Sequence, residues 1–274
     1  MSIAATLSAG ISVHGHRGAR TVLPENTLPG FEYAIAKGVD WIEIDLWVTK
    51  DNVVVIAHDP AMNEKHCTGP KGAEKVIRKM TLAELKRWDC GTPANSDYPR
   101  QKAVPGTRVP TFDEVLALAP KGKFGFNVEI KSYPNQPELA PPLTEYARLV
   151  VEAILKHKLE NRVMIQSFDW RMLHATEKLA PELPRSALFP TSRQDRERDF
   201  VDVAKDANVK MVSVQYDTVT PEKVKKAHGA GLKVIAWTAN SAEVWDRLVA
   251  AKVDEIITDD PAKLIAYLEG KKLR

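Results

Sequence analysis

Acidic residues alternate with apolar ones in a segment that reads Trp-Ile-Glu-Ile-Asp-Leu-Trp-Val over Trp41–Val48. The side chains of a β-strand alternate between its two faces, so Glu43 and Asp45 share one face. Two carboxylates one pleat apart repel each other unless a cation or a proton neutralises one of them. Carboxylate oxygens suit Mg²⁺, Mn²⁺ or Ca²⁺ rather than thiolate-preferring ions. We therefore predict a divalent metal site here, in preference to an exposed acidic face on an edge strand.

A second segment repeats this alternation and adds a cation. Phe124–Lys131 reads Phe-Gly-Phe-Asn-Val-Glu-Ile-Lys, which places Asn127, Glu129 and Lys131 on one face of a strand. Glu129 is a candidate third oxygen ligand. The Lys131 ammonium is a point charge that can hold an anionic oxygen of a substrate. The alternative is a buried Glu129–Lys131 pair that only neutralises itself.

Two histidines end apolar runs of the chain. His16 stands in His-Gly-His-Arg-Gly, and His58 stands in Ala-His-Asp. An unperturbed imidazole has a pKa of about 6.5, so two histidines that face each other across a metal could serve as general acid and general base. Arg17 can contact a phosphate in bidentate fashion, and Gly18 lets the backbone pass close to a ligand. The remaining histidines are expected to be structural: His14, His66, His157, His174 and His228.

Eight short apolar or alternating runs, bounded by turn residues, are the strands expected to position these side chains. They are Ile11–Arg17, Trp41–Val48, Phe124–Lys131, Arg162–Phe168, Arg185–Phe189, Met211–Gln215, Lys233–Thr238 and Asp254–Thr258. Helical patterns follow at Asn26–Lys37, Thr111–Leu118, Leu143–Lys158, Trp170–Leu179, Asp195–Ala207, Pro221–Ala230, Ala242–Ala251 and Pro261–Leu268. Eight βα units are the number at which a parallel sheet can close on itself and leave no edge. We therefore predict an α/β fold, a (β/α)8 TIM barrel.

One segment interrupts this pattern. A further apolar run, Val53–Ala57, is followed by a long stretch from Pro60 to Pro110 that is rich in Gly, Pro, Lys and Asn, with a short helical pattern at Leu82–Trp88. A connection of that length within a compact fold is typically a functional lid or subdomain. No hinge between domains is visible, so we predict one domain over residues 11–270 with an insertion at residues 60–110.

Composition sets the broad class of the protein. The chain has 274 residues with 39 Lys and Arg against 36 Asp and Glu, a formal net charge of +3, and 44% of its residues are hydrophobic. These values are typical of a soluble globular protein. So small a positive excess argues against sequence-independent nucleic-acid binding. No apolar run approaches the roughly 18 residues of a membrane span, and nothing in the sequence predicts an oligomeric state.

The two cysteines, Cys67 and Cys90, are too few for a disulfide-rich scaffold or a cysteine-based zinc site. Free thiols are the expected state, and a single disulfide is the alternative in an oxidising compartment. Residues Met1–Gly10 lack the basic start and the long apolar stretch of a secretory signal. We therefore expect a cytoplasmic protein, or a periplasmic or secreted one if a leader has been removed.

Several motifs give the chain a family resemblance. In order, they are His-Arg-Gly-Ala-Arg at His16–Arg20, Pro-Glu-Asn-Thr at Pro24–Thr27, Gly-Val-Asp-Trp-Ile-Glu-Ile-Asp at Gly38–Asp45 and Ala-His-Asp at Ala57–Asp59. With this order and spacing the chain resembles the glycerophosphodiester phosphodiesterase family. The likeness extends through Val109–Glu114, Val128–Lys131, Gln166–Phe168, Trp237–Thr238 and Thr258–Pro261.

The resemblance implies a TIM barrel with an insertion after its second strand, and an enzyme that hydrolyses small glycerophosphodiesters, such as deacylated phospholipids, to glycerol 3-phosphate and an alcohol. It makes His16 and His58 the acid/base pair, without saying which is the acid. In this family the nucleophile is thought to be the 2-hydroxyl of the glycerol, which gives a cyclic phosphate that water then opens.

The resemblance also assigns binding residues. It makes Glu43, Asp45 and Glu129 the ligands of a divalent ion, usually Mg²⁺ or Ca²⁺. Arg17 and Lys131 would contact the phosphate. Trp237 would line the glycerol site, although a tryptophan at a barrel mouth is as often simple packing. Glu25 would orient Arg17, and Asn26 would cap the first helix.

Two other functions remain open. A related barrel could cleave lysophospholipids or sphingomyelin, as a lysophospholipase D or sphingomyelinase D does, and a longer apolar surface beside the site would favour it. A non-catalytic barrel could bind a phosphate ligand, but then an acid/base or metal residue should be missing, and none is. Lys65-His66-Cys67-Thr68 departs from the family pattern, which leaves recognition of the alcohol undefined.

Overall fold

Eight parallel strands form a closed barrel in a computed structural model that describes residues 10–92, 95–189 and 193–274. The strands are β1 (Ser12–Gly15), β2 (Trp41–Val48), β4 (Gly125–Ile130), β5 (Val163–Ser167), β6 (Arg185–Leu188), β7 (Met211–Gln215), β8 (Lys233–Trp237) and β9 (Glu255–Thr258). They pair in the order β1-β9-β8-β7-β6-β5-β4-β2, and β1 also pairs with β2. The predicted TIM barrel is confirmed, because that last pairing closes the sheet.

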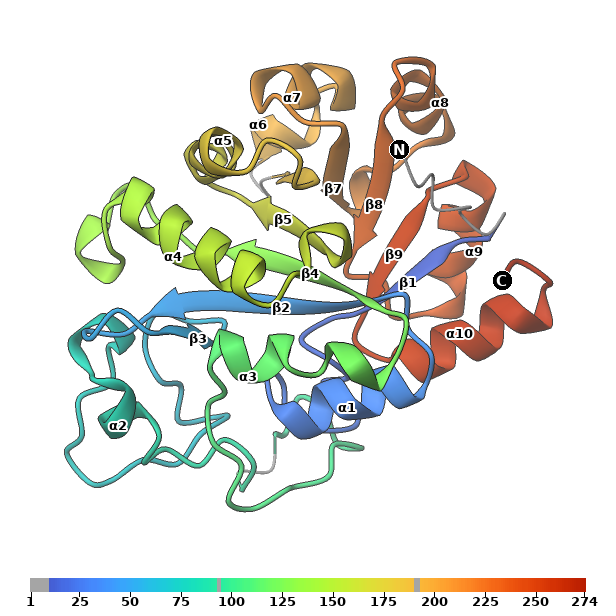
Figure 1. The fold of residues 1–274 in the computed structure, drawn as a ribbon. Coiled ribbons are helices and arrows are strands. Elements are labelled where there is room, and N and C mark those ends of the chain that lie inside the picture. The colour runs from blue at the N-terminus through green and yellow to red at the C-terminus, as the bar shows by residue number, and fades with distance from the viewer. Residues whose placement is uncertain (1–9, 93–94, 190–192) are drawn as a thin grey trace.

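The helices lie outside the strands (Figure 1). They are α1 (Leu28–Ala36), α2 (Leu82–Leu85), α3 (Phe112–Leu116), α4 (Leu143–Lys156), α5 (Trp170–Leu179), α6 (Arg193–Arg196), α7 (Phe200–Asp206), α8 (Pro221–Gly229), α9 (Ala242–Ala251) and α10 (Pro261–Gly270). Side-chain caps start several of them. Thr27, Thr220 and Ser241 each accept a hydrogen bond from a backbone N–H of the first turn. None of the helices among the described residues is long and apolar enough to cross a membrane.

The single helix predicted over Asp195–Ala207 is wrong, because the structure has two helices there, α6 and α7. The cause is Asp199, which adopts an extended conformation and accepts a hydrogen bond from the backbone N–H of Val201. An aspartate in that role begins a new helix. We expected no secretory signal in Met1–Gly10. All of these residues except Gly10 lie outside the described residues.

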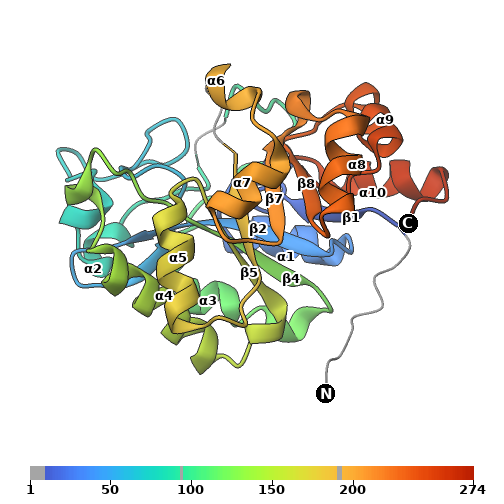
Figure 2. The ribbon, with the colours of Figure 1, turned by 90° about the horizontal axis from the view of Figure 1, so that it is seen from above.

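The insertion begins beyond β3 (Val54–Ile56), which runs antiparallel to β2. It lies with α2 on the side of the barrel away from α9 and α10 (Figures 1 and 2). The insertion has a hydrophobic core of its own, with Ile77, Leu85 and Trp88 among its buried residues. Trp47 belongs to this core and donates from Nε1 to the carbonyl of His58. The distal end of β2 therefore packs against the insertion.

The expected free thiols are contradicted by the structure, in which Cys67 and Cys90 form a disulfide. Their neighbours explain why the two cysteines meet. Thr68 and Asp89 exchange two backbone hydrogen bonds, of 2.7 and 2.8 Å, across an antiparallel bridge. That pairing sets the Cα atoms of the cysteines 3.9 Å apart. The sequence shows only their separation of 23 residues, which does not indicate this pairing.

Replacing both cysteines by alanine is expected to lower the free energy of unfolding by about 3 kcal/mol, because a loop of this length loses its cross-link in the unfolded chain. Urea unfolding followed by circular dichroism measures the change. A reducing agent should lower the unfolding midpoint of the wild type and leave that of the double variant unchanged. Equal unfolding midpoints for the oxidised wild type and the double variant would contradict the prediction.

Candidate active site

Three carboxylates meet inside the barrel, as the sequence predicts. Asp45 on β2 pairs in register with Glu129 on β4, and Glu43 lies one pleat earlier on β2. Each of the three residues offers one carboxylate oxygen, and these three oxygens all lie within 4.8 Å of one another. All three are buried, with exposures of 2% for Glu43, 1% for Asp45 and 6% for Glu129. Three carboxylates that close together require cations or protons to neutralise part of their charge.

Two cations partly supply that charge. Lys131 Nζ lies 3.1 Å from Asp45 Oδ1 and 2.8 Å from Glu129 Oε1. Arg17 Nε lies 3.4 Å from Asp45 Oδ2. Burial tends to raise the pKa of Asp45, but Lys131 and Arg17 outweigh burial and hold that pKa well below its usual range.

Glu43 is less fully compensated, because Arg17 lowers its pKa but does not outweigh burial and the neighbouring carboxylates. Burial, followed by repulsion from Asp45 and Glu129, raises the pKa of Glu43 well above its usual range. Burial also raises the pKa of Glu129, against the opposing effect of Lys131. Negative charge is therefore in excess in this cluster, and every candidate metal ligand in it is a carboxylate oxygen. Both properties fit a hard divalent cation.

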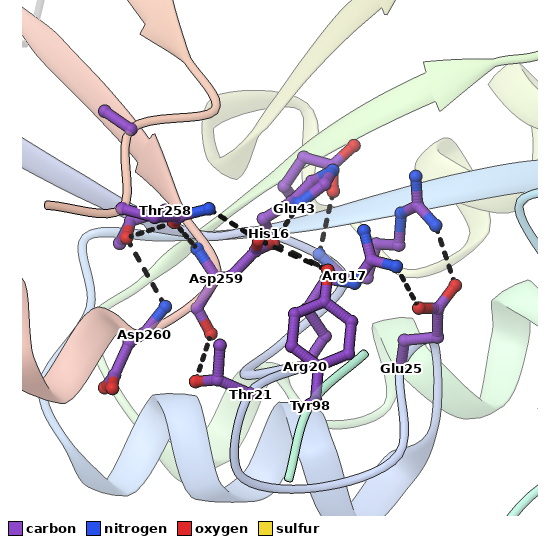
Figure 3. Close-up of polar contacts among 12 residues, drawn as sticks. His16, Arg17, Arg20, Thr21, Glu25, Glu43, Tyr98, Thr258, Asp259 and Asp260 are labelled. Carbon is purple, nitrogen blue, oxygen red and sulfur yellow. Dashed lines mark hydrogen bonds and ion pairs between the residues drawn. The ribbon is translucent and has the colours of Figure 1, made fainter. Parts of the chain in front are cut away.

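His16 follows β1 and is held by an aspartate that the sequence analysis did not assign to the site. His16 Nδ1 lies 2.5 Å from Asp259 Oδ1, just beyond the end of β9 (Figure 3). Asn240 Nδ2 donates to the other oxygen of Asp259 at 2.7 Å. Burial lowers the pKa of His16 below 6.5, although Asp259 acts to raise it. Asp259 stands in the Thr-Asp-Asp-Pro motif, and its place directly after a barrel strand was the available signal.

Asp259 thus orients the His16 ring and leaves Nε2 for chemistry. Replacing Asp259 by Asn is expected to reduce kcat by roughly 10²-fold, because the amide neither fixes the tautomer nor stabilises an imidazolium. Steady-state kinetics on a glycerophosphodiester measures the effect. Asp254→Asn is the matched control, since Asp254 holds the exposed His228 at 3.0 Å. Unchanged kcat in Asp259→Asn would remove Asp259 from the site.

His58 follows β3 and is also held by an aspartate. Its Nδ1 lies 2.7 Å from Asp59 Oδ1, and Asn63 Nδ2 donates to Asp59 Oδ2 at 3.1 Å. His58 lies close enough to the carboxylate cluster to contribute to the lowered pKa of Asp45 and to oppose the effect of burial, which raises the pKa of Glu129. Its side chain is 34% exposed, against 15% for His16. The two histidines therefore share a partner type but differ in their access to solvent.

His58 opens onto a groove of about 880 Å³. Glu129 and Lys131 lie at one part of this groove, and its other lining residues include three aromatic ones: Tyr133, Phe168 and Trp170. His174, which the sequence analysis treats as structural, lines it as well. The groove thus joins the buried charges to solvent.

Glu25 forms ion pairs with both Arg17 and Arg20, and these pairs fix the loop that carries Arg17 (Figure 3). Arg17 Nη1 lies 2.7 Å from Glu25 Oε1, and Arg20 Nη2 lies 2.6 Å from Glu25 Oε2. This confirms that Glu25 orients Arg17. Gly18, which we expected to let the backbone pass close to a ligand, allows a close approach to α1. It has φ +91°, and a Cβ added there would lie 2.8 Å from the carbonyl carbon of Gly30 in α1.

Asn26 is not the cap of α1, contrary to the expectation from the family resemblance. Thr27 Oγ1 accepts from the backbone N–H of Gly30 and so caps the helix. Asn26 instead has φ +54° and donates from Nδ2 to Asp45 Oδ2 at 2.8 Å. The motif that suggested a cap therefore supplies a donor to the carboxylate cluster.

Trp237 lies at the end of β8, half-buried at the barrel mouth. Its Nε1 donates to the carbonyl of Ser213 at 3.0 Å, and its ring meets Phe168 edge-on at 5.6 Å between centroids. These contacts fix the indole beside the groove. Its role toward glycerol stays a prediction.

Four of the histidines predicted to be structural have partners apart from this cluster. His14 is buried between Glu255 and Asn127, and the other three bind Asn95, Asp113 and Asp254: His66, His157 and His228, respectively.

Comparisons with known proteins agree with this geometry. The profile of the glycerophosphoryl diester phosphodiesterase family matches residues 16–263. A glycerophosphodiester phosphodiesterase from Caldanaerobacter subterraneus subsp. tengcongensis is 31% identical, over 92% of this chain and 96% of the relative. A crystal structure from Silicibacter pomeroyi, of a protein with a provisional glycerophosphoryl diester phosphodiesterase name, is 32% identical with a TM-score of 0.88, and the match covers 96% of this chain and 95% of that one.

An Oleispira antarctica phosphodiesterase, solved in complex with the product sn-glycerol-3-phosphate, is 25% identical with a TM-score of 0.77. The match covers 95% of this chain and 97% of that one. The family profile spans all eight of the residues that the sequence analysis placed in the site. The protein therefore belongs to the glycerophosphoryl diester phosphodiesterase family.

Proposed function

We propose that this protein hydrolyses glycerophosphodiesters to glycerol 3-phosphate and an alcohol. The observation that carries the proposal is the arrangement of His16 and His58, each bound through Nδ1 to an aspartate, beside a buried cluster of three carboxylates. Among the described residues neither imidazole has a hydrogen-bond partner at Nε2, so both can move a proton to and from a reacting oxygen. A divalent cation held by the cluster, together with Arg17 and Lys131, would provide the positive charge that an anionic phosphodiester requires.

Glu43, Asp45 and Glu129 would hold a divalent cation, with Mg²⁺ and Ca²⁺ the candidates. When bound, such an ion withdraws charge from the phosphoryl oxygens and so favours attack on phosphorus. Arg17 and Lys131 would add positive charge to the same phosphate. Both are buried against the carboxylates, so their positions are fixed before the substrate arrives.

In the first step, His16 would accept the proton of the glycerol 2-hydroxyl as that oxygen bonds to phosphorus. Its lowered pKa supports this role, because the ring is then neutral near pH 7. The bond from phosphorus to the alcohol breaks, and His58 gives its Nε2 proton to the departing oxygen. His58 suits this role because it is the more exposed histidine and lies on the groove through which an alcohol can leave.

In the second step, the roles are reversed. His58 takes a proton from water as the water oxygen bonds to phosphorus. The bond from phosphorus to the glycerol 2-oxygen breaks, and His16 returns its proton to that oxygen. The products are glycerol 3-phosphate and the alcohol, and both histidines regain their starting states.

A panel of substrates tests the proposed function. The purified protein is incubated with glycerophosphocholine, glycerophosphoethanolamine, glycerophosphoinositol and lysophosphatidylcholine, after chelation and with Mg²⁺ or Ca²⁺ restored. Release of glycerol 3-phosphate from the deacylated substrates supports the proposal. Cleavage of lysophosphatidylcholine alone would favour the lysophospholipase D alternative, and no cleavage of any substrate would refute catalysis.

We further propose that the protein works in an oxidising compartment. The Cys67–Cys90 disulfide supports this location, because such bonds persist outside the reducing cytosol. Thiol alkylation of the protein in freshly lysed cells would test it, since a cytosolic protein would be labelled at both cysteines.

A further inference from the structure

A chain of three hydrogen bonds crosses the barrel interior and ends on Glu43. Gln166 Nε2 donates to Glu43 Oε1 at 3.3 Å, and Ser213 Oγ donates to Gln166 Oε1 at 3.2 Å. The Ser186 and Ser213 hydroxyl oxygens lie 2.8 Å apart. All four side chains are buried, with exposures of 2% or less. Residues on β5, β6 and β7 are thereby connected to a carboxylate on β2.

The directions of these bonds follow from the protons available. A serine hydroxyl has one proton to donate, and Ser213 gives its proton to Gln166. The contact between the serines therefore has Ser186 as donor. Ser213 in turn fixes the Gln166 amide, with Oε1 toward Ser213 and the NH₂ group toward Glu43. With Glu43 ionised, as a ligand of a cation must be, the opposite orientation would bring two acceptor oxygens together where no solvent reaches.

Glu43 is held from both sides. Its Oε2 accepts the backbone N–H of Arg17 at 2.9 Å, and its Oε1 accepts from Gln166. A carboxylate oxygen can accept more than one contact, so each oxygen keeps the capacity to bind a cation. We propose that Ser213, acting through Gln166, is a positioning residue that orients Glu43 toward a divalent cation. This inference rests on the cation site of the proposed function.

A neighbouring serine shows what a purely structural hydroxyl looks like here. Ser167 is also fully buried and lies next to Gln166, on the opposite face of β5. Its Oγ donates to the carbonyl of Ile130 at 2.7 Å and accepts from the backbone N–H of Asp169. Backbone groups thus satisfy that serine completely. Ser186 and Ser213 instead make side-chain contacts that lead to Glu43.

Isothermal titration of the metal-free protein with MgCl₂ and with CaCl₂ tests the inference. Residues that orient a metal ligand typically change metal affinity by about 10- to 100-fold. We therefore expect Ser213→Ala to raise the Kd by about 10-fold or more. Ser213→Thr keeps the hydroxyl, so its Kd for the cation should be close to that of the wild type. Ser167→Ala should lower the thermal midpoint and leave the Kd unchanged.

Gln166→Met gives a second variant if Ser213→Ala does not fold, since it keeps the volume and removes both hydrogen bonds. Gln166→Met should raise the Kd for the cation by a similar factor. A wild-type Kd in either Ser213→Ala or Gln166→Met would overturn the positioning role while leaving the proposed function intact. A wild-type protein that binds neither ion would overturn the cation site itself.

Discussion

Replacing either His16 or His58 by alanine is expected to lower turnover by about 10²- to 10⁴-fold, because each variant lacks one of the two proton-transfer groups. The substrate still meets the cation site, Arg17 and Lys131, so KM should change much less than kcat. Steady-state release of glycerol 3-phosphate from glycerophosphocholine measures both constants. The double variant should lose little more than the worse single variant, since groups that act as a unit are not additive.

His157→Ala is the matched control for these variants. His157 also binds an aspartate, Asp113, at 2.7 Å, but on the surface of the protein. Its removal should leave kcat unchanged. Near-normal turnover in both single active-site variants would refute the assignment of the acid/base pair.

Removing the cation is the second change with a large expected effect. Chelation should abolish measurable hydrolysis, and Asp45→Asn should reduce kcat/KM by about 10³-fold or more, since charge stabilisation by a metal ion contributes several kcal/mol. Added Mg²⁺ or Ca²⁺ should restore the chelated wild type. The same ions should restore the Asp45→Asn variant poorly, because that variant keeps only two of the three carboxylates.

Glu152→Gln provides the control for the loss of a carboxylate. Glu152 lies on α4 and pairs with Arg148 near the surface, with its side chain 57% exposed. Its variant should retain full activity and the same response to the chelator. Hydrolysis that continues undiminished after chelation would contradict the carboxylate site.

The barrel could be predicted from the sequence because its strands are buried and short. Trp41–Val48 and Met211–Gln215 match the structure at both ends, and the three carboxylates follow from alternation alone. Alternation carries this information because one face of each strand meets the barrel interior and the other meets helices.

The parts that the sequence did not reveal depend on contacts between distant segments. Asp259 reaches His16 from 243 residues away, and only the closure of β9 onto β1 brings them together. The Cys67–Cys90 pair depends on a bridge within the insertion, whose irregular chain has no periodicity to read. Trp47 has the alternation of a barrel-facing residue, but β2 extends past the barrel and carries it into the core of the insertion.

Metal-dependent hydrolysis through a cyclic phosphate can be followed directly by phosphorus NMR of glycerophosphocholine during incubation with the metal-supplemented wild-type protein. The diester resonance should disappear and that of glycerol 3-phosphate should replace it, with a five-membered cyclic phosphate as the intermediate. The same sample with EDTA, and a sample of His16→Ala, should keep the diester. A diester signal that persists with the wild type and either metal would contradict the claim, as would equal conversion by His16→Ala.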